Sequence, residues 1–377
     1  METYGEYLGK ATGKLGFGLM RLPVLPGTED IDIEQLKVMV DHFMAAGFTY
    51  FDTAYVYGAG ASERAIKEAL VQRYPRDRFT LATKMNASLG HPSEADVKKQ
   101  FAISLERTGA GYFDYYLLHA VQENNYKTYT AYGIWDFVRN LKQEGKIRHW
   151  GFSFHAGPEL LDELLTEHPD VDFIQLQINY ADWDNPSVES RANYEIARKH
   201  KVPFVVMEPL KGGTLANPPE NVASVLKSAA PESSVASWGI RFAASLDGCI
   251  TVLSGMSDIL QMDDNLSYMK DFQPLTEAEQ QVIKNAQEAL EKLNLIKCTA
   301  CHYCTAGCPV EMHIPDIFAA MNKNLLNNHQ GALASYARAV KDGSKASDCI
   351  RCGQCEGACP QRLPIISLLE KCASALE

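Results

Sequence analysis

Four polar residues whose side chains could exchange a proton follow apolar, β-type runs in the first third of the chain. Asp52 and Tyr57 lie in FTYFDTAYVYG (residues 48–58), Lys84 lies in FTLATKM, and His119 lies in DYYLLHA. A phenol has an ordinary pKa of about 10, so it needs a cation and a hydrogen-bonding neighbour to donate a proton near neutrality. Each residue alone is more often a turn, packing or surface group. The set together predicts a proton-donating site.

A second group of chemistry-bearing residues is the cysteines, which are unevenly placed. Of ten cysteines, only Cys249 precedes Cys298, and the last is Cys372. The runs CTACHYCTAGCP and CIRCGQCEGACP share the spacing C-x2-C-x2-C-x3-C-P, which is the bacterial ferredoxin spacing for 4Fe–4S clusters. Zinc sites more often use two separated ligand pairs, so they fit this pattern less well. We therefore predict iron–sulfur clusters, and packing roles for the two leftover cysteines, Cys249 and Cys372.

The spacing also predicts which cysteines share a cluster. In this type of run the first three thiolates bind one cluster and the fourth binds the other. One predicted ligand set is Cys298, Cys301, Cys304 and Cys359, and the other is Cys349, Cys352, Cys355 and Cys308. His302 and His313 lie nearby and are interpreted as exposed or packed side chains.

The elements that must position the first group alternate between strand and helix. Expected strands cover residues 15–20, 48–52, 79–84, 115–119, 147–153, 173–177, 202–207 and 249–253. Expected helices cover 33–46, 61–74, 93–109, 129–143, 158–168, 188–200, 233–245 and 259–269. Near-continuous apolar strands are typical of a parallel sheet, and eight such units predict an α/β protein with a (β/α)8 TIM barrel. A doubly wound sheet is less well supported, because no GxGxxG joins a strand to a helix.

The barrel prediction has a consequence for the site. Active sites of this fold lie at the C-terminal ends of the strands, where all four proton-exchanging residues fall. Three domains are expected: a barrel at 1–275, a helical linker at 276–297, and a mainly helical ferredoxin-type domain at 298–377. Residues 1–14 are interpreted as a hairpin that closes the barrel floor.

Composition limits the classes of partner and location. The chain has 377 residues, 46% of them apolar, and a net charge of -11, which disfavours nucleic acid and anionic membranes as partners. The N-terminal residues METYGEYLGKATGK lack the apolar core of a signal peptide, and no apolar run reaches membrane-spanning length. A cytoplasmic protein is expected, and exposed clusters would fit an anaerobic host.

FDTAYVYG, LATKM and YLLHA together resemble the aldo/keto reductases, and the likeness runs from about Leu15 to about Asn265. The resemblance implies a barrel enzyme that transfers hydride from a nicotinamide cofactor to a carbonyl. It implies that Tyr57 is the general acid, that Lys84 lowers the pKa of Tyr57, and that Asp52 holds Lys84. His119 would orient the carbonyl.

The same resemblance implies cofactor contacts. Ser153 and Gln175 would hold the nicotinamide carboxamide, although Phe154 replaces an expected Asn. The other implied contacts are Met207 at a stacking position, Leu210, a phosphate loop with Lys211 and Gly212, and Asn265 at the adenine. The alternative interpretation of Lys211–Gly213 is an ordinary flexible loop. Gly255 and Gln261 stand where many NADPH-using members carry Lys and Arg. The cofactor could therefore be NADH, NADPH or a flavin such as FMN.

Some bacterial aldo/keto reductases carry a similar C-terminal extension with cluster motifs, and three functional hypotheses follow. The first is a nicotinamide-dependent carbonyl reductase whose two 4Fe–4S clusters exchange electrons with a ferredoxin or another redox protein. In the second, a flavin in the barrel divides the hydride into single electrons for the clusters. The third is a non-catalytic electron-transfer or docking module, which the four intact catalytic-type residues disfavour. We favour the first.

Overall fold

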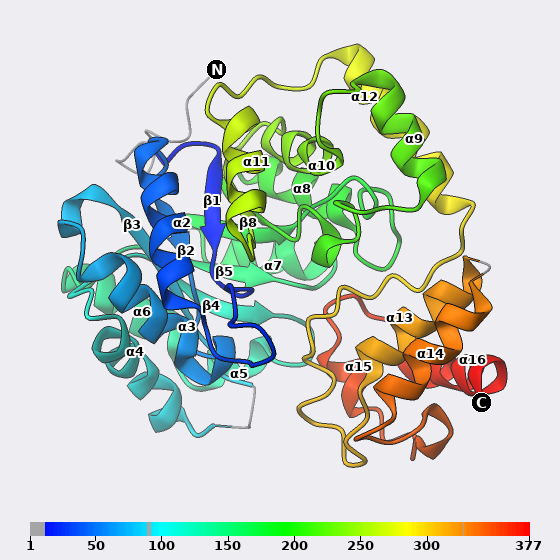
Figure 1. The fold of residues 1–377 in the computed structure, drawn as a ribbon. Helices are drawn as coiled ribbons and strands as arrows, with labels where there is room; N and C mark the ends of the chain where they lie inside the picture. The colour runs from blue at the N-terminus through cyan, green and yellow to red at the C-terminus, as the bar shows by residue number, and fades with distance from the viewer. Residues whose placement is uncertain (1–11, 89–91, 327) are drawn as a thin grey trace. The chain divides into compact units, whose positions relative to one another are not determined.

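The computed structural model describes residues 12–88, 92–326 and 328–377. Eight parallel strands close into a barrel in the order β1 to β8, with β8 paired to β1 (Figure 1). The strands are β1 (Leu15–Gly18), β2 (Tyr50–Asp52), β3 (Thr80–Met85), β4 (Phe113–Val121), β5 (Ile147–Phe154), β6 (Phe173–Gln177), β7 (Phe204–Met207) and β8 (Cys249–Ser254). The predicted fold class is confirmed. The hairpin expected at residues 1–14 lies, apart from residues 12–14, outside the described residues.

The strands form because their residues are apolar or β-branched and are buried on both faces. Large side chains such as Tyr50, Tyr115 and Phe173 fill the barrel interior, where Tyr115 packs edge-on against Phe173 at 5.3 Å between ring centroids. On the outer side, Phe51 packs edge-on against Phe43 of the next layer at 5.1 Å. A filled interior leaves the strand ends as the place where polar side chains can gather.

Helices surround the strands (Figure 1). They are α2 (Ile33–Ala45), α3 (Ala61–Ile66), α4 (Glu94–Thr108), α5 (Tyr126–Ala131), α6 (Ile134–Gln143), α7 (Pro158–Glu167), α8 (Ser190–Lys199), α10 (Val235–Ala244) and α11 (Ile259–Met269), with short turns η1 (Tyr57–Gly60), η2 (Lys67–Val71) and η3 (Arg76–Arg78). The helix expected at 129–143 is two helices, because Gly133 takes a left-handed φ of 59° between them. The helix expected at 61–74 changes to a π-helical turn at η2.

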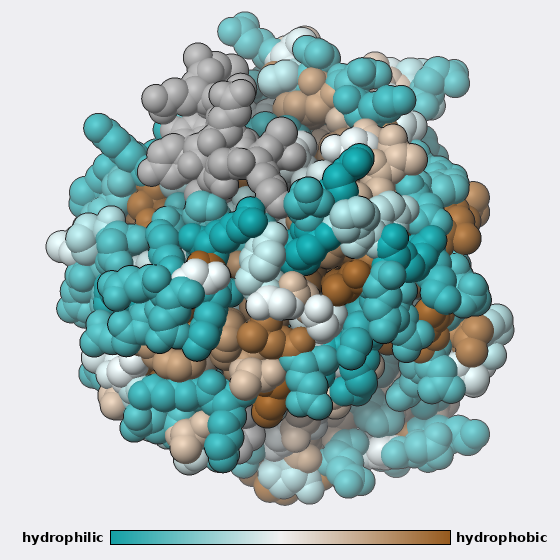
Figure 2. Space-filling view, turned by 90° about the vertical axis from the view of Figure 1, so that its left-hand side faces the viewer, coloured by the Kyte–Doolittle hydropathy of each residue, from teal (hydrophilic) through white to brown (hydrophobic). Residues whose placement is uncertain are grey.

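The outward faces of these helices are mostly polar. Figure 2 shows hydrophilic side chains over most of the face on which α3 and α4 lie, with smaller hydrophobic areas between them. In α2, for example, Leu36, Met39 and Val40 are buried whereas Glu34 is exposed. This pattern of one apolar stripe per helix is what a helix packed on a barrel requires.

A second compact unit contains residues 185–188, 210–235 and 278–377. Its helical elements are α9 (Glu220–Ala229), α12 (Glu277–Glu291), α13 (Ile314–Leu325), α14 (His329–Ala339), α15 (Gln354–Ala358) and α16 (Ile365–Leu376), with turns η4 (Lys211–Gly213) and η5 (Ala346–Asp348). Asn221 of α9 donates to the carbonyl of Ala289 in α12 at 3.3 Å. The unit thus includes the segment 210–235, which lies between two barrel elements in the sequence. This segment contains α9, a helix that sequence patterning did not predict.

The core of the second unit is small and helical. Ile317 and Phe318 of α13 and Leu369 and Cys372 of α16 are among its buried residues. Cys372 is fully buried, which agrees with the packing role expected for it, and Cys249 is likewise fully buried in β8 of the barrel. The short helices α13, α14 and α16 confirm that the cysteine-rich region is mainly helical (Figure 1).

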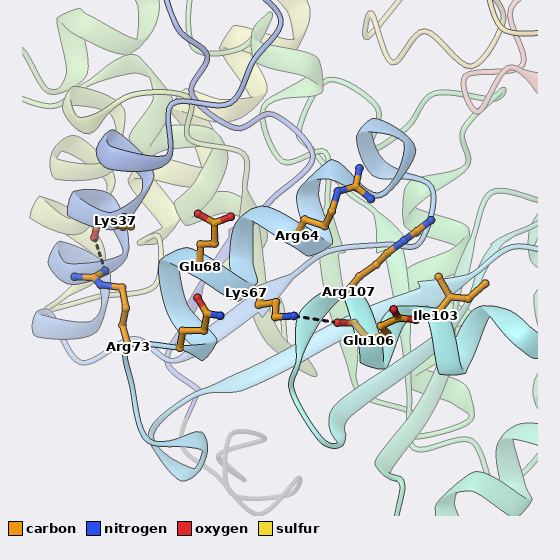
Figure 3. A pocket seen from close by; sticks show the side chains of 9 residues that line it. Lys37, Arg64, Lys67, Glu68, Arg73, Ile103, Glu106 and Arg107 are labelled. Atoms are coloured by element: carbon orange, nitrogen blue, oxygen red, sulfur yellow. Dashed lines mark hydrogen bonds between the residues drawn. The ribbon is translucent and has the colours of Figure 1, made fainter.

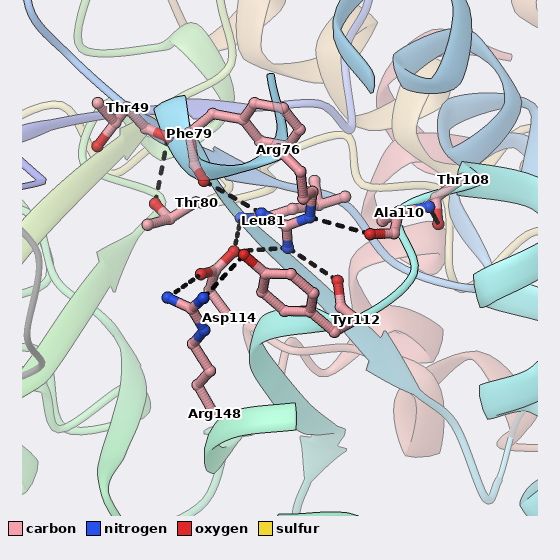
Figure 4. Close-up of polar contacts among 10 residues, drawn as sticks. All are labelled: Thr49, Arg76, Phe79, Thr80, Leu81, Thr108, Ala110, Tyr112, Asp114 and Arg148. Atoms are coloured by element: carbon pink, nitrogen blue, oxygen red, sulfur yellow. Dashed lines mark hydrogen bonds and ion pairs between the residues drawn. The ribbon is translucent and has the colours of Figure 1, made fainter. Parts of the chain in front are cut away.

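The buried carboxylate of Asp114 contacts residues at the N-terminal ends of neighbouring barrel strands (Figure 4). Asp114, which is 2% exposed at the start of β4, accepts from Arg76 Nη2 at 2.7 Å and from the amide of Leu81 at 3.0 Å. Arg148 of β5 lies 3.4 Å from its other oxygen. Arg76 also donates to the carbonyl of Tyr112 at 2.8 Å. This network lies at the barrel end opposite the proton-exchanging residues, so its role is structural.

Asp114→Asn should lower the free energy of unfolding by about 3 kcal/mol, because it leaves the Arg76 charge without its carboxylate in a largely buried site. Urea unfolding followed by circular dichroism measures the change. Asp170→Asn is the matched control, since Asp170 is half exposed and pairs with Arg139 on the surface. That control should lose less than about 1 kcal/mol. Equal unfolding midpoints for the two variants would contradict the structural role of Asp114.

Candidate active site and cluster cysteines

The fold brings the four proton-exchanging residues to one end of the barrel. Asp52 is the last residue of β2, Tyr57 begins the turn η1 shortly after it, and Lys84 and His119 lie near the ends of β3 and β4. Because β2, β3 and β4 are neighbouring parallel strands, their C-terminal ends meet at one rim. Residues far apart in sequence thereby converge.

Lys84 is the centre of this group. Its Nζ donates to Asp52 Oδ1, to the carbonyl oxygen of Thr53 at 2.8 Å and to the Tyr57 hydroxyl at 3.4 Å. The Lys84 side chain is completely buried, whereas Tyr57 is partly exposed. The Tyr57 and His119 rings meet edge-on at 5.7 Å between centroids. The phenol therefore lies between a buried ammonium and an imidazole.

The pKa of Tyr57 differs from the sequence-based expectation. Burial raises this pKa well above its ordinary value, and the negative charges of Asp52 and Glu208 act in the same direction. The net direction is opposite to the lowering that the resemblance implies for Lys84. The phenol is therefore protonated at neutral pH, as a proton donor must be, although a raised pKa makes it a weaker acid.

The other three residues are also shifted by burial. Burial lowers the pKa of Lys84 and raises that of Asp52, while their mutual attraction opposes both shifts. Burial, the Lys84 charge and His155 together lower the pKa of His119 well below its ordinary value. His119 is thus neutral at neutral pH. Its Nδ1 is buried and makes no hydrogen bond within the described structure.

Two of the predicted nicotinamide contacts lie side by side on neighbouring strands. Ser153 of β5 and Gln175 of β6 are register partners, and each is at most 2% exposed. The Ser153 hydroxyl accepts from the amide of Ala120 at 2.7 Å and still has its own proton to donate. The Gln175 Oε1 atom is buried, and no group among the described residues donates a hydrogen bond to it. A carboxamide, which both donates and accepts, fits these two groups.

The remaining predicted cofactor contacts are more dispersed. Met207 ends β7 and is partly exposed, and Leu210 follows three residues later in a turn. Asn265 of α11 is buried and already bonded, because its Nδ2 donates to Ser254 at 2.8 Å and its Oδ1 accepts from Tyr268. At the start of the same helix, Gln261 donates to the capping carboxylate of Asp258 at 2.9 Å.

The predicted phosphate loop makes contacts with the cysteine-rich region, and its role in phosphate binding stays a prediction. Lys211 and Gly212 belong to the second compact unit, where Lys211 is 4% exposed and its Nζ donates to Gln361 Oε1 at 3.3 Å. The backbone of Gly212 lies against the carbonyl of Thr299. These contacts direct the lysine toward the cysteine-rich region.

The eight predicted ligand cysteines form two groups. Cys308 lines one small, mostly apolar cavity with Cys349, Cys352 and Cys355; its other lining residues include Val310, Met312, Ile350 and Leu369. In the other group, Cys298, Cys301 and Cys359 are each close enough that their charge raises the pKa of Cys304, although burial is the larger cause. Both groups match the predicted sets, because the fourth cysteine of each run lies with the first three cysteines of the other run.

A cubane cluster remains the predicted occupant of each cysteine group. A cluster binds one thiolate per iron, so its ligands surround a volume instead of meeting at a point. Among residues 12–88, 92–326 and 328–377, no three His, Cys, Asp or Glu side chains converge on one metal ion. Burial raises the pKa of the Cys355 thiol to about 11, and metal binding by such a thiol releases its proton.

Sequence reasoning missed Glu208 and Thr53 at the barrel rim. Glu208 directly follows β7, and its carboxylate charge raises the pKa of Tyr57. Its place beside Met207 was a usable signal, since polar residues just after barrel strands tend to face the site. The contact of Thr53 with Lys84 is made by a backbone carbonyl, which side-chain patterns cannot reveal.

A wide groove lies elsewhere, on the outer surface of α2, η2 and α4 (Figure 3). Its volume is about 990 Å³, and its lining includes Lys37, Arg64, Lys67, Glu68, Arg73, Glu106 and Arg107. Several of these cations are already engaged: Arg73 bonds Asp41 at 2.6 Å, Lys67 donates to the carbonyl of Glu106 at 3.4 Å, and Arg107 pairs with Glu63. The charges of Arg73 and Arg107 are therefore neutralised by neighbouring carboxylates, and we assign the groove no ligand.

Comparisons with known proteins agree with both halves of the chain. The sequence model of the aldo/keto reductase family matches residues 14–288, and that of a 4Fe-4S dicluster domain matches residues 297–363. No helix within the described residues is both long and apolar enough to cross a membrane.

Individual relatives match the barrel half. "Uncharacterized oxidoreductase YqkF" of Bacillus subtilis is 24% identical over 285 residues, covering 64% of this chain and 88% of its own length. "Probable aldo-keto reductase 1" of Glycine max is 33% identical, covering 46% of this chain and 50% of its own length. Among solved structures, aldo-keto reductase AKR11C1 from Bacillus halodurans is 26% identical, with a TM-score of 0.57, covering 73% of this chain and 92% of its own. An aldo-keto reductase from Klebsiella pneumoniae in complex with NADPH shares the fold, with a TM-score of 0.59 at 20% identity, covering 74% of this chain and 92% of its own.

Proposed function

The chain belongs to the aldo/keto reductase family, and we propose that it interconverts an aldehyde or ketone and the alcohol, with hydride from a nicotinamide cofactor and a proton from Tyr57. The observation that carries the proposal is the contact group at the barrel rim, where buried Lys84 bonds both Asp52 and the Tyr57 hydroxyl. Its membership makes the chain an oxidoreductase. The small carbonyl substrate and the acid role of Tyr57 are part of the proposal.

Each residue of the site has a different proposed role in the reaction. When bound, a nicotinamide supplies the hydride; Gln175 and Ser153 would hold its carboxamide, because the buried Gln175 Oε1 needs a donor. The Tyr57 hydroxyl holds the proton that the carbonyl oxygen receives. Lys84 donates to that hydroxyl and stabilises the phenolate left behind. Neutral His119, edge-on to Tyr57, can donate a hydrogen bond to the same carbonyl oxygen.

The pKa shifts predict a flat pH profile for the reductive step. Because the pKa of Tyr57 is raised above 10 and that of His119 is lowered below 6.5, neither group changes protonation between those pH values. We expect the rate of carbonyl reduction, measured by stopped flow with deuterated cofactor, to stay within about threefold from pH 6.5 upward until Lys84, whose pKa burial lowers, loses its charge. Alcohol oxidation, which needs an unprotonated acceptor, should rise with pH. A reductive rate that rises about tenfold between pH 6.5 and pH 9 would contradict the acid role of Tyr57, because a proton donor gains nothing from the loss of protons.

We further propose that the C-terminal unit binds two 4Fe–4S clusters, one on each cysteine group, which exchange electrons with a ferredoxin or other redox protein. The match to a dicluster domain and the enclosed cavity at Cys308 support this. The group formed by Cys308, Cys349, Cys352 and Cys355, which we call the second group, has the more accessible loop. In this loop Cys352 is exposed and Ile350 is 60% exposed. Electron transfer to a partner requires a cluster close to the surface, which this loop provides.

A flavin in the barrel, such as FMN, is the alternative in which hydride is divided into single electrons for the clusters. The departures from the usual cofactor contacts, such as Phe154 and Gln261, motivate it. Clusters carry one electron at a time, whereas hydride carries two, so one site must perform the division if the halves are coupled.

One experiment separates these routes. Anaerobically purified protein is titrated with NADH and then with NADPH while the visible absorbance of the clusters is followed, first without and then with an added aldehyde. Cofactor consumption that depends on aldehyde, with cluster absorbance unchanged, supports the carbonyl reductase. Bleaching of the clusters without aldehyde, together with flavin released on denaturation, would replace it with the flavin route. No consumption by any aldehyde or alcohol tested would contradict the proposal.

A further inference from the structure

A lysine from the segment after β7 lies against the cysteine group formed by Cys298, Cys301, Cys304 and Cys359, which we call the first group. Lys211 opens η4, and its buried Nζ donates to Gln361 Oε1 at 3.3 Å. Gln361 is 3% exposed and lies two residues after Cys359, a member of that group. The lysine and the ligand-bearing loop are thus in contact within one compact unit.

Backbone packing fixes the lysine in this place. A Cβ atom added at Gly212 would lie 2.2 Å from the carbonyl oxygen of Thr299, and Gly212 has a φ of 64°. Thr299 directly follows Cys298 and is 3% exposed. Only glycine allows this approach, because any larger residue would push the segment away from the cysteine loop. Lys211 is therefore held next to Cys298 by a rigid contact.

Lys211 lies close to ligand cysteines of both runs. The residue after it packs against Thr299, which directly follows Cys298, and its Nζ bonds Gln361, two residues after Cys359. The amide of Ala300 donates to Cys298 Sγ at 3.4 Å. The lysine and this amide both favour negative charge at this sulfur. A cluster bound by four thiolates carries net negative charge, so it would experience the same field.

We propose that Lys211 raises the reduction potential of the cluster held by Cys298, Cys301, Cys304 and Cys359. Gain of one electron makes a 4Fe–4S cluster more negative by one charge, and a fixed ammonium in a buried site stabilises that reduced form more than the oxidised form. The inference rests on the proposed loading of this cluster. It gives the lysine a role in the electron-transfer half of the chain instead of in phosphate binding.

The second cluster provides an internal reference. Near its cysteines, Arg351 lines the cavity but is exposed and pairs with Glu370 at 2.6 Å. Water and this carboxylate screen the Arg351 charge. A change at Lys211 should therefore move one potential and leave the other in place.

The test is a potentiometric titration of the full, anaerobically loaded chain, followed by electron paramagnetic resonance. Lys211→Met keeps most of the side-chain length and removes the charge, and Lys211→Arg is the matched control that keeps the charge. Cys308→Ser, which should leave only the first cluster, serves as the background that assigns the signals. In Lys211→Met we expect the ratio of reduced to oxidised first cluster at a fixed potential to fall about tenfold, equivalent to about 59 mV for one electron. Lys211→Arg should stay within about threefold.

The outcomes test the role of Lys211 separately from the proposal that the chain binds clusters. Wild-type protein without cluster signals or iron would overturn the cluster proposal itself. Normal loading with unchanged potentials in Lys211→Met would overturn only the role of Lys211. If Lys211→Met loads poorly, Lys211→Gln is measured next. Failure of both neutral variants to load while Lys211→Arg loads normally would support a charge interaction, whereas equal failure of all three would show a packing role and overturn the inference.

Discussion

Tyr57→Phe should lower kcat for carbonyl reduction by about 100- to 10,000-fold, which is the usual contribution of a positioned general acid. The change removes one hydroxyl, whose hydrogen-bond donor in the structure is Lys84 Nζ at 3.4 Å. Lys84 keeps its contacts with Asp52 and with the Thr53 carbonyl, so the buried pair and the fold should be preserved. The affinity for NADPH, measured by fluorescence titration, should therefore change by less than about threefold.

Tyr55→Phe is the matched control for this variant. Tyr55 lies two residues earlier in the same loop, and the Arg107 guanidinium lies over its ring, 4.5 Å from the ring centroid. Loss of its hydroxyl should leave kcat within about twofold of the wild type. A Tyr57→Phe enzyme with wild-type kcat and an unchanged deuterium isotope effect would remove Tyr57 from the acid role. Lys84 is a poorer first target, because its loss leaves Asp52 as an unpaired buried charge and destabilises the fold.

Cys308→Ser should remove the second cluster and spare the first, although Cys308 belongs to the first sequence run. Cys308 lines the cavity of Cys349, Cys352 and Cys355, so its loss opens that cavity. We expect the iron content to fall to about half, and the remaining paramagnetic signal to equal that of Cys349→Ser. Cys359→Ser should instead give the spectrum of Cys298→Ser, because those two sulfurs interact.

These pairs distinguish crossed ligation from a local arrangement in which each run binds its own cluster. Under local ligation, Cys308→Ser would match Cys298→Ser, and the crossed assignment would be wrong. Cys372→Ala is the control, since Cys372 is fully buried in α16 among apolar residues. It should retain the iron content of the wild type, even if packing loss lowers the thermal midpoint.

The positions of the strands followed from local pattern alone. Buried parallel strands leave continuous apolar runs, and eight of them alternating with helices allow few folds other than the barrel. Local pattern was weaker where one residue changed the backbone path. Gly133 divides one expected helix into α5 and α6, and α9 lies in a segment where no helix was expected.

The candidate sites were predictable to the extent that chemistry follows residue type and spacing. Asp52, Tyr57, Lys84 and His119 could be chosen because each ends an apolar run, and parallel strands carry such residues to one rim. The two cysteine runs indicated clusters because their spacing suits a cubane. Residue identity and short-range spacing therefore determined which groups can react.

The tertiary structure decided how those groups behave. The upward pKa shift of Tyr57 comes from burial, from Asp52 and from Glu208, and Glu208 is 151 positions later in the chain (208 minus 57) with no local signature near Tyr57. The contact of Lys211 with Gln361 spans 150 residues. Desolvation and long-range electrostatics depend on which distant segments pack together, and periodicity within a segment carries no information about that. The sequence by itself thus identified the reacting groups, and only the packed structure set the direction of the Tyr57 pKa shift and the position of Lys211 beside a cysteine-bearing loop.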